Sequence, residues 1–190
     1  MAQRLGVVLA GGAGRRMGRP KGDLVVDGRA MAERAARTLA PVCASVLISV
    51  APGAVNPAPS FTSVEDAPPA GRGPLAGLQA AFLATGSADL VVLACDYPAA
   101  STDLLRAVLA QAPEDADCVF PTDLRGRDHP LVGLWRRGAL EEIEASLASS
   151  IYKVRAVLAG LRVHRVHPAD LFGLDVAAEL HNMNEVERTP

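Results

Sequence analysis

The sequence has little of what marks a disulfide-stabilised, membrane-spanning or nucleic-acid-binding protein. Its three cysteines, Cys43, Cys95 and Cys118, are far apart and form no Cys-x-x-Cys pair or Cys/His cluster, so neither disulfides nor a zinc site is expected. Nineteen basic residues stand against 21 acidic ones, which leaves no general positive charge for nucleic acid. No apolar run approaches the roughly 20 residues that span a bilayer, and no N-terminal segment resembles a secretion signal. We therefore expect a cytoplasmic protein.

Short apolar runs alternate with longer stretches of helical period, which is the pattern of strand–helix units around a largely parallel sheet. Most of the expected strands are continuously apolar, as is typical of strands that helices cover on both faces. They run over residues 5–9, 45–50, 90–94, 118–121, 131–135 and 161–167. The expected helices run over residues 30–39, 75–83, 101–111, 137–149 and 152–159. The sequence thus predicts an α/β fold in a single domain over residues 1–190.

A loop rich in glycine and arginine follows the first expected strand. The stretch LAGGAGRRMGRPK, from Leu9 to Lys21, holds four glycines, three arginines and a lysine. Glycines let backbone N–H groups turn towards phosphate oxygens, and the cations neutralise the charge that gathers there. The loop fits neither familiar template, because Lys21 is not followed by Ser or Thr as in a P-loop and Met17 occupies the third small position of the dinucleotide fingerprint. A phosphate-binding loop of another kind is expected, and a dehydrogenase is disfavoured.

Five further short motifs follow this loop in order. They are Val64-Glu65-Asp66, Gly73-Pro74-Leu75-Ala76-Gly77, Cys95-Asp96-Tyr97-Pro98, Arg127-Asp128-His129-Pro130 and Asn182-Met183-Asn184. Together with the loop, they make the sequence resemble the molybdenum cofactor guanylyltransferases over nearly its whole length. The resemblance implies a three-layer, Rossmann-like nucleotidyltransferase fold with a mostly parallel central sheet. It implies transfer of GMP from GTP to the phosphate of molybdenum-bound molybdopterin, with release of pyrophosphate, Mg²⁺ as cofactor, and cofactor-accepting apoenzymes or delivery proteins as partners.

The resemblance also assigns roles to residues at the carboxyl ends of the expected strands, where open α/β sheets bind their ligands. The nucleotide is expected to bind Leu9, Ala10, Gly11, Gly12, Lys21, Asp66, Gly73, Gly77 and Asp96. The expected catalytic residues are Arg16, Lys21 and Asp96. Arg16 and Lys21 would stabilise the charge on the departing pyrophosphate. Asp96 would bind Mg²⁺, because a carboxylate after an apolar strand is costly to bury alone and Mg²⁺ prefers oxygen ligands.

Three residues are expected to bind the acceptor substrate. His129 precedes a strand, where its side chain would contact a phosphate or the acidic pterin. Asn182 and Asn184 alternate along an extended segment, so both side chains can point at one site. Structural roles remain open beside these: Asp96 as the cap of a turn, Asp66 as a carboxylate that stabilises its loop, and the asparagines as helix caps.

Base selectivity depends on one departure from the family pattern. Ser49 stands where guanylyltransferases usually carry an asparagine, and its shorter side chain cannot make a paired amide contact. Cytidylyl transfer to the same pterin, transfer to another phosphorylated small molecule, and a non-catalytic nucleotide-binding module therefore stay open. Residues 51–73, rich in proline, glycine and alanine, are expected to form a long loop at the rim of the site, with Asp66 at the end of a strand.

Overall fold

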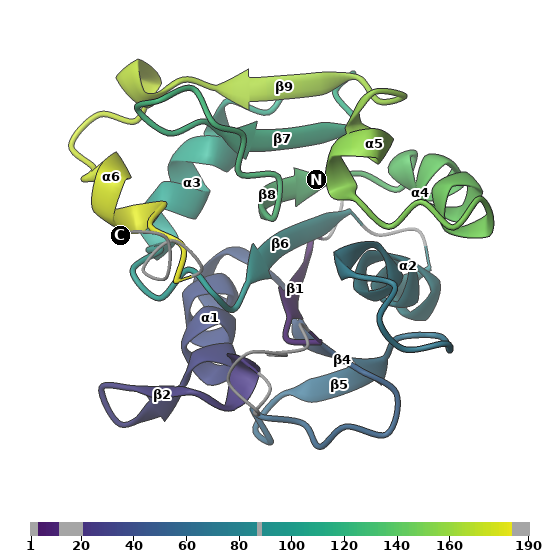
Figure 1. The fold of residues 1–190 in the computed structure, drawn as a ribbon. Coiled ribbons are helices and arrows are strands. Elements are labelled where there is room, and N and C mark those ends of the chain that lie inside the picture. The colour runs from purple at the N-terminus through teal and green to yellow at the C-terminus, as the bar shows by residue number, and fades with distance from the viewer. Residues whose placement is uncertain (1–3, 12–20, 87–88, 184–190) are drawn as a thin grey trace, which may run out of the picture.

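The computed structural model describes residues 4–11, 21–86 and 89–183, with only the main chain of Lys21. A seven-stranded sheet runs through its middle (Figure 1). Its strands, in the order in which they lie side by side, are β5 (Thr62–Glu65), β4 (Val46–Val50), β1 (Leu5–Leu9), β6 (Leu90–Ala94), β8 (Val132–Trp135), β7 (Cys118–Pro121) and β9 (Val163–Val166). Strand β8 runs antiparallel to both neighbours, and the other pairs are parallel. The prediction of an α/β fold with a mostly parallel sheet is confirmed.

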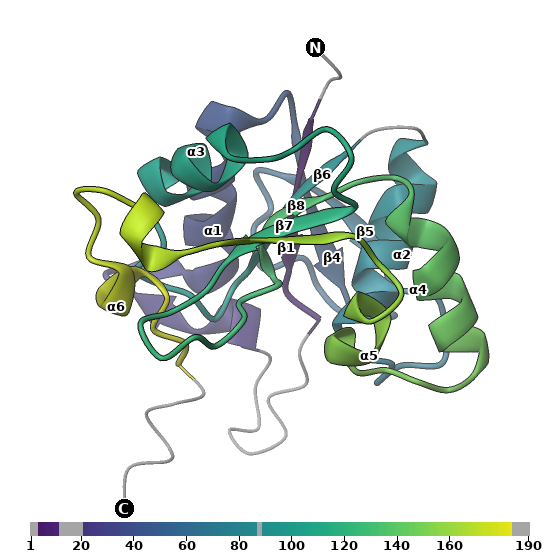
Figure 2. The same ribbon diagram turned by 90° about the horizontal axis from the view of Figure 1, so that it is seen from above.

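Helices cover both faces of this sheet (Figure 2). Helices α1 (Met31–Leu39), α3 (Thr102–Ala110) and α6 (Val176–Glu179) lie on one face. Helices α2 (Pro74–Thr85), α4 (Ala139–Ala148) and α5 (Val154–Leu158) lie on the other. The result is the expected three-layer arrangement.

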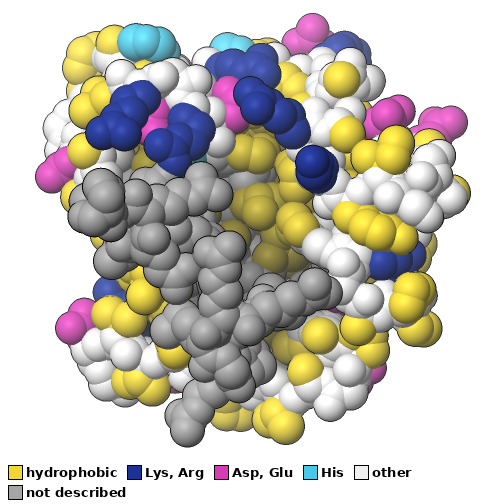
Figure 3. All heavy atoms as spheres, viewed as in Figure 1, with side chains coloured by type: hydrophobic (Ala, Val, Ile, Leu, Met, Phe, Trp, Pro, Cys, Tyr) yellow, Lys and Arg dark blue, Asp and Glu magenta, His cyan; other side chains and the backbone are white. Residues whose placement is uncertain are grey.

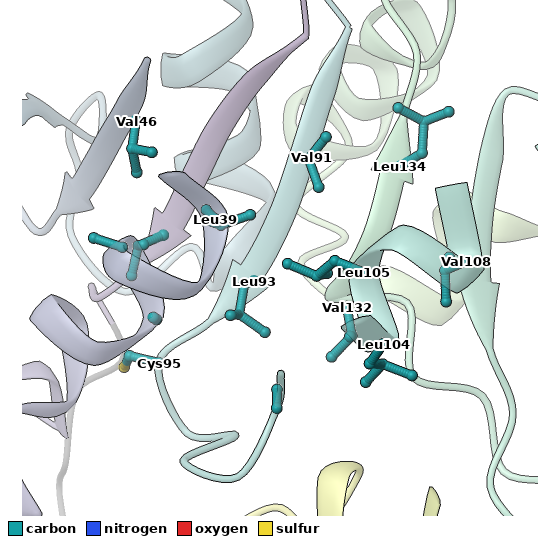
Figure 4. Close-up of a cluster of buried hydrophobic side chains, with 14 of the residues drawn as sticks. Leu39, Val46, Val91, Leu93, Cys95, Leu104, Leu105, Val108, Val132 and Leu134 are labelled. Carbon is teal, nitrogen blue, oxygen red and sulfur yellow. The ribbon is translucent and has the colours of Figure 1, made fainter. Parts of the chain in front are cut away.

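Each face of the sheet has its own apolar core. Successive residues of a strand point to opposite faces, so Val91 and Leu93 of β6 pack towards α3 while Val92 packs against the other helical layer. Figure 4 shows Val91 and Leu93 beside Leu105 of α3, in the first of these cores. Because all five residues of β6 are buried, its sequence is apolar without interruption. Burial on both faces explains why such strands were predictable.

Elements with little apolar character were foreseen only in part. Strand β5 interrupts the segment 51–73 that was expected to be a loop, so that expectation is wrong for residues 62–65, while the strand expected to end at Asp66 is present. The bounds of β5 could not be predicted because this edge strand is largely exposed and has no apolar run. A small hairpin of β2 (Val25–Val26) and β3 (Arg29–Ala30) was also missed, as were the short 3-10 helices η1 (Lys21–Asp23), η2 (Ala40–Val42) and η3 (Pro168–Asp170). No helix in the described part of the chain is both long and apolar enough to cross a membrane.

The topology brings several loops to one edge of the sheet. From β1 the chain moves outwards to β4 and β5 on one side, and later strands are added from β6 on the other side. In such sheets, ligands bind beyond the carboxyl ends of the strands where this reversal occurs. Here that point lies between β1 and β6, whose last residues Leu9 and Ala94 are paired in register.

Candidate functional site

Main-chain hydrogen bonds hold together the segments that follow four parallel strands. The N–H of Ala10 donates to Ser49 O at 2.9 Å, and the N–H of Cys95 donates to Leu9 O at 3.3 Å. The N–H of Asp66 donates to Val50 O at 2.9 Å. These bonds align the first residues beyond β1, β5 and β6 with the last residues of β1 and β4 along the carboxyl edge. Sequence positions that are more than 80 residues apart thereby become neighbours.

Asp66 directly follows β5, as expected, and its two carboxylate oxygens have different surroundings. Ser49 Oγ donates a hydrogen bond of 2.7 Å to Asp66 Oδ1. Asp66 Oδ2 lies over Gly11, where an added Cβ would be only 3.1 Å away from it. Burial raises the pKa of Asp66 above its usual value, although the Ser49 hydrogen bond and the Arg72 guanidinium act in the opposite direction. The carboxylate is therefore a half-buried acceptor beside the start of the predicted phosphate-binding loop.

Two glycines fix how closely helix α2 approaches this carboxylate. A Cβ on Gly77 would overlap Ser49 Oγ and would lie 2.9 Å from Leu9 Cδ2, so a side chain at this position would push α2 away from β1 and β4. Gly73 caps the N-terminus of α2 with a φ of 70°, which favours glycine. A Cβ on Gly73 would also be 3.1 Å from the Tyr152 carbonyl oxygen. The structure thus gathers Gly11, Asp66 and Gly77, and at Gly77 the close approach of α2 to Ser49 leaves no room for a Cβ.

Asp96 lies in the turn after β6, next to the segment at the far end of the described chain. Its carbonyl oxygen accepts a 3.0 Å hydrogen bond from the N–H of Met183. The neighbouring Asn182 forms a hydrogen bond with the Tyr97 side chain. Asp96 and Asn182, predicted separately from sequence, are thereby brought to the same place.

The oxygen donors at this edge suit a magnesium ion. Mg²⁺ typically takes one or two carboxylates together with substrate phosphates and waters, and the half-buried Asp96 carboxylate stands beyond a fully buried strand. In the described ranges, no group of three or more His, Cys, Asp or Glu side chains is arranged to hold a metal. A magnesium site that nucleotide phosphates complete fits this donor set.

His129 is buried, with 3% of its surface exposed. Its Nδ1 is 3.0 Å from Tyr97 Oη, and its Nε2 is 3.5 Å from Asp123 Oδ2. Burial lowers the pKa of His129, although the neighbouring Asp123 raises it. Burial also raises the pKa of Tyr97 to about 12. Both rings are therefore neutral near pH 7, and the contact of His129 with the acceptor substrate stays a prediction.

A cavity of about 420 Å³ lies on the β7–β9 side of this edge, and sequence reasoning did not identify it as a site. Its lining comprises Gly126, Arg127, Asp128, Pro130, Arg155, Leu158 and Arg165. Arg165 forms a bidentate ion pair with Asp128, with N–O distances of 2.8 and 3.0 Å. Figure 3 shows Lys and Arg side chains gathered over this part of the molecule, above a hollow lined by hydrophobic side chains. The motif Arg127-Asp128-His129-Pro130 supplies part of the lining, but the cationic character also depends on Arg155 and Arg165, which no local motif signals.

Some of the predicted site residues lie in parts of the chain that the structure does not describe. Gly12, Arg16 and Asn184 lie outside the described residues, and their expected roles stay predictions. Lys21 begins η1, and the next residue, Gly22, lies so close to the site that an added Cβ would be 3.1 Å from Ala10 Cβ. The main chain of η1 therefore returns to the carboxyl edge, and the role of the Lys21 side chain stays a prediction.

Residues 6–169 match a family described as the MobA-like NTP transferase domain. The sequence is 35% identical over 189 residues to a probable molybdenum cofactor guanylyltransferase of Pelotomaculum thermopropionicum, with 97% of this chain and 89% of that protein covered. It is 34% identical to a protein of the same name from Mycobacterium marinum, with 92% and 90% covered.

Solved structures show the same fold. Molybdopterin-guanine dinucleotide biosynthesis protein A from Archaeoglobus fulgidus superposes with a TM-score of 0.77 at 22% identity, covering 95% of this chain and 92% of that one. The 2-C-methyl-D-erythritol 4-phosphate cytidylyltransferase of Thermus thermophilus superposes with a TM-score of 0.61 at 21% identity, covering 95% and 94%. At these identities the likeness concerns the architecture, which confirms the predicted nucleotidyltransferase fold.

Proposed function

The chain belongs to the MobA-like NTP transferase family, and from that premise we propose that it transfers GMP from GTP to the phosphate of molybdenum-bound molybdopterin, forming the guanine dinucleotide cofactor. The observation that carries the proposal is the alignment of Gly11, Asp66 and Asp96 along one edge of the sheet. It is supported by the names of relatives that share about a third of the sequence over nearly the full length. GTP and molybdopterin are the proposed substrates, and delivery proteins or apoenzymes are the proposed recipients of the product.

The nucleotide is proposed to lie on the β1–β4–β5 side of the edge. Gly11 is half-buried and carries no side chain that would separate its backbone from a ligand, and Asp66 supplies an acceptor beside it. Gly77 lets α2 pack directly against Ser49, which holds that carboxylate. We propose that the nucleoside binds near Asp66 and Gly73 and that the phosphates extend towards Gly12. Arg16 and Lys21 are the proposed partners of the pyrophosphate.

The proposed reaction is a direct displacement at phosphorus. An oxygen of the acceptor phosphate attacks the α-phosphorus of GTP, a new P–O bond forms, and the bond to pyrophosphate breaks, so no covalent enzyme intermediate is needed. Asp96 would hold Mg²⁺, which when bound neutralises charge on the phosphates. Arg16 and Lys21 stabilise the negative charge that develops on the leaving group.

The acceptor is proposed to approach from the β7–β9 side. Strand β6 separates the nucleotide residues from the cationic cavity, and a displacement needs attacking and leaving oxygens on opposite sides of the phosphorus. Within the described residues Arg155 has no hydrogen-bond or ion-pair partner, so its full charge is available to an anionic acceptor. Asn182 stands between the two sides, next to Asp96. His129, Asn182 and Asn184 remain the acceptor-binding candidates from the sequence.

Nucleotide binding and product analysis test the proposal. Calorimetry with GTP, CTP, ATP and UTP, each with Mg²⁺, should show a preference for GTP. Incubation with GTP and the molybdenum-bound pterin should then release pyrophosphate and yield the guanine dinucleotide. Selective binding of CTP would instead support cytidylyl transfer, which the serine at position 49 leaves open. GTP binding with no pyrophosphate released would point to a non-catalytic module.

A further inference from the structure

Ser49 is one of few buried polar side chains among the described residues, with 1% of its surface exposed. It lies one residue before the end of β4, and Asp66 follows the neighbouring strand β5. The 2.7 Å hydrogen bond from Ser49 Oγ to Asp66 Oδ1 links the two strands at the carboxyl edge. A buried hydroxyl that lost this partner would be costly, so the bond constrains both side chains.

The Ser49 hydroxyl is also confined from the side of α2. The Gly77 backbone lies so close that a Cβ there would overlap Ser49 Oγ, and the same Cβ would be 3.3 Å from Ser49 Cβ. The hydroxyl is thus held between the α2 main chain and the Asp66 carboxylate. Because α2 leaves it little room, the Ser49 side chain cannot turn towards a ligand without breaking its bond to Asp66.

This arrangement leaves the second carboxylate oxygen in a defined place. With Oδ1 held by Ser49, Asp66 Oδ2 lies over Gly11, and an added Cβ on Gly11 would also be 3.3 Å from Ala51 N. An ionised carboxylate only accepts hydrogen bonds. The oxygen over Gly11 is therefore suited to a donor group of a ligand that lies against the loop after β1.

We propose that Ser49 is a positioning residue for nucleotide recognition, which fixes the Asp66 carboxylate so that Oδ2 accepts a hydrogen bond from the nucleoside of GTP. This inference rests on the proposed function. The donor is either a ribose hydroxyl or the 2-amino group of guanine, which share the same chemistry towards a carboxylate oxygen. Ser49 itself does not touch the nucleotide, and a serine at this position is therefore compatible with guanine selectivity.

Electrostatics favour the same role for Ser49. Burial disfavours the charged form of Asp66, and the Ser49 hydroxyl is the first of the groups that counteract this effect, followed by Arg72. Removing the hydroxyl would both release the carboxylate from its orientation and favour its protonated form. Either change weakens a site that needs a fixed acceptor.

The test compares Ser49→Ala with Ser146→Ala, a matched control because Ser146 is a buried serine in α4. Calorimetry with GTP and Mg²⁺ should give a dissociation constant about tenfold higher for Ser49→Ala, the effect of losing a hydrogen bond to a charged group, and no change for Ser146→Ala. In the Asp66→Asn background, adding Ser49→Ala should cause little further loss, since the two residues act as one unit. If Ser49→Ala does not fold, Ser49→Cys, which keeps the size but donates weakly, replaces it.

Analogues identify the donor. The penalty of Ser49→Ala should disappear with 2′-deoxy- or 3′-deoxy-GTP if Asp66 accepts from the ribose, and with inosine triphosphate if it accepts from the 2-amino group. Three outcomes would overturn the inference while the proposed function stands. Ser49→Ala could lose the same affinity for GTP and for every analogue, or it could bind GTP as tightly as the wild type. The losses of Ser49→Ala and Asp66→Asn could also simply add in the double variant. If the wild-type protein binds no nucleoside triphosphate, the proposed function fails and this inference fails with it.

Discussion

The partly buried Tyr97 and the buried His129 form a pair in which Tyr97 Oη lies 3.0 Å from His129 Nδ1 and the two rings meet edge to face at 74°. Tyr97 belongs to the turn that carries Asp96, and His129 belongs to the segment before β8. Asn182 forms a hydrogen bond with the same tyrosine. The proposed magnesium ligand therefore stands on a turn that two distant segments brace, and its position depends on residues that need not touch the substrates.

Tyr97→Phe should therefore weaken both stability and catalysis. It leaves the buried Nδ1 of His129 without its partner, which costs about 1–3 kcal/mol of the free energy of unfolding. Urea denaturation measures this loss, and steady-state kinetics should show a fall in kcat larger than any change in GTP affinity. Tyr152→Phe is the control, since Tyr152 is 37% exposed and should change neither quantity. Equal stability of Tyr97→Phe and the wild-type protein would contradict the bracing role.

The burial of His129 also predicts how stability depends on pH. Its pKa is lowered below the ordinary value of 6.5 in the folded protein, chiefly by burial, so the unfolded chain binds a proton more readily. This contribution to stability is fully present above pH 6.5 and is lost as the pH falls below it. Thermal unfolding between pH 7.5 and 5.5 should show this decline, and His129→Gln should have a shallower one than His164→Gln. Equal slopes for the two variants would rule out His129 as the source.

The sequence predicts those parts of the structure that are set by local patterns. Continuous apolar runs located β1 and β6 because helices cover both of their faces. The positions of Asp66 and Asp96 at the carboxyl ends of expected strands predicted that they would share an edge. The exposed strand β5 lacked such a run. The contacts of Ser49 and His129 were not foreseeable, because each is made with a residue on another element. A departure from the family pattern did mark Ser49, but only the fold shows that it bonds Asp66.

Gly77→Ala should be destabilising although it lies in a helix. Helix propensity alone would favour alanine by roughly 0.8–1.0 kcal/mol. The new methyl group would overlap Ser49 Oγ and approach Leu9 Cδ2 to 2.9 Å, and overpacking of this kind costs about 1–3 kcal/mol. We expect a lower melting temperature in differential scanning calorimetry and weaker GTP binding in isothermal titration calorimetry. A variant more stable than the wild type would show that α2 can move away from β4 at little cost.

Asp96→Asn should fold normally and lose most of its activity. Asparagine keeps the size of the side chain but removes the charge that would bind Mg²⁺, so kcat should fall by about 10²–10³-fold, as when a group that stabilises the transition-state charge is removed. The rate of pyrophosphate release, measured against Mg²⁺ concentration, reports this loss. Asp103→Asn is the control, because Asp103 is exposed and pairs only with the exposed Arg106 among the described residues. Unchanged activity in Asp96→Asn would remove the proposed metal role.

Arg155→Gln should separate acceptor binding from nucleotide binding. Arg155 lines the cationic cavity, where its charge would meet the phosphate of the acceptor. Loss of one charge-assisted contact should raise the KM for the molybdenum-bound pterin about tenfold. The dissociation constant for GTP should stay unchanged, because the proposed nucleotide-binding residues Gly11 and Asp66 lie on the other side of β6. Arg106→Gln, on the exposed face of α3, controls for the general loss of positive charge. An effect on GTP affinity as large as that on the acceptor would mean that the cavity does not form a separate acceptor site, and the acceptor would then have to be sought nearer to Asn182.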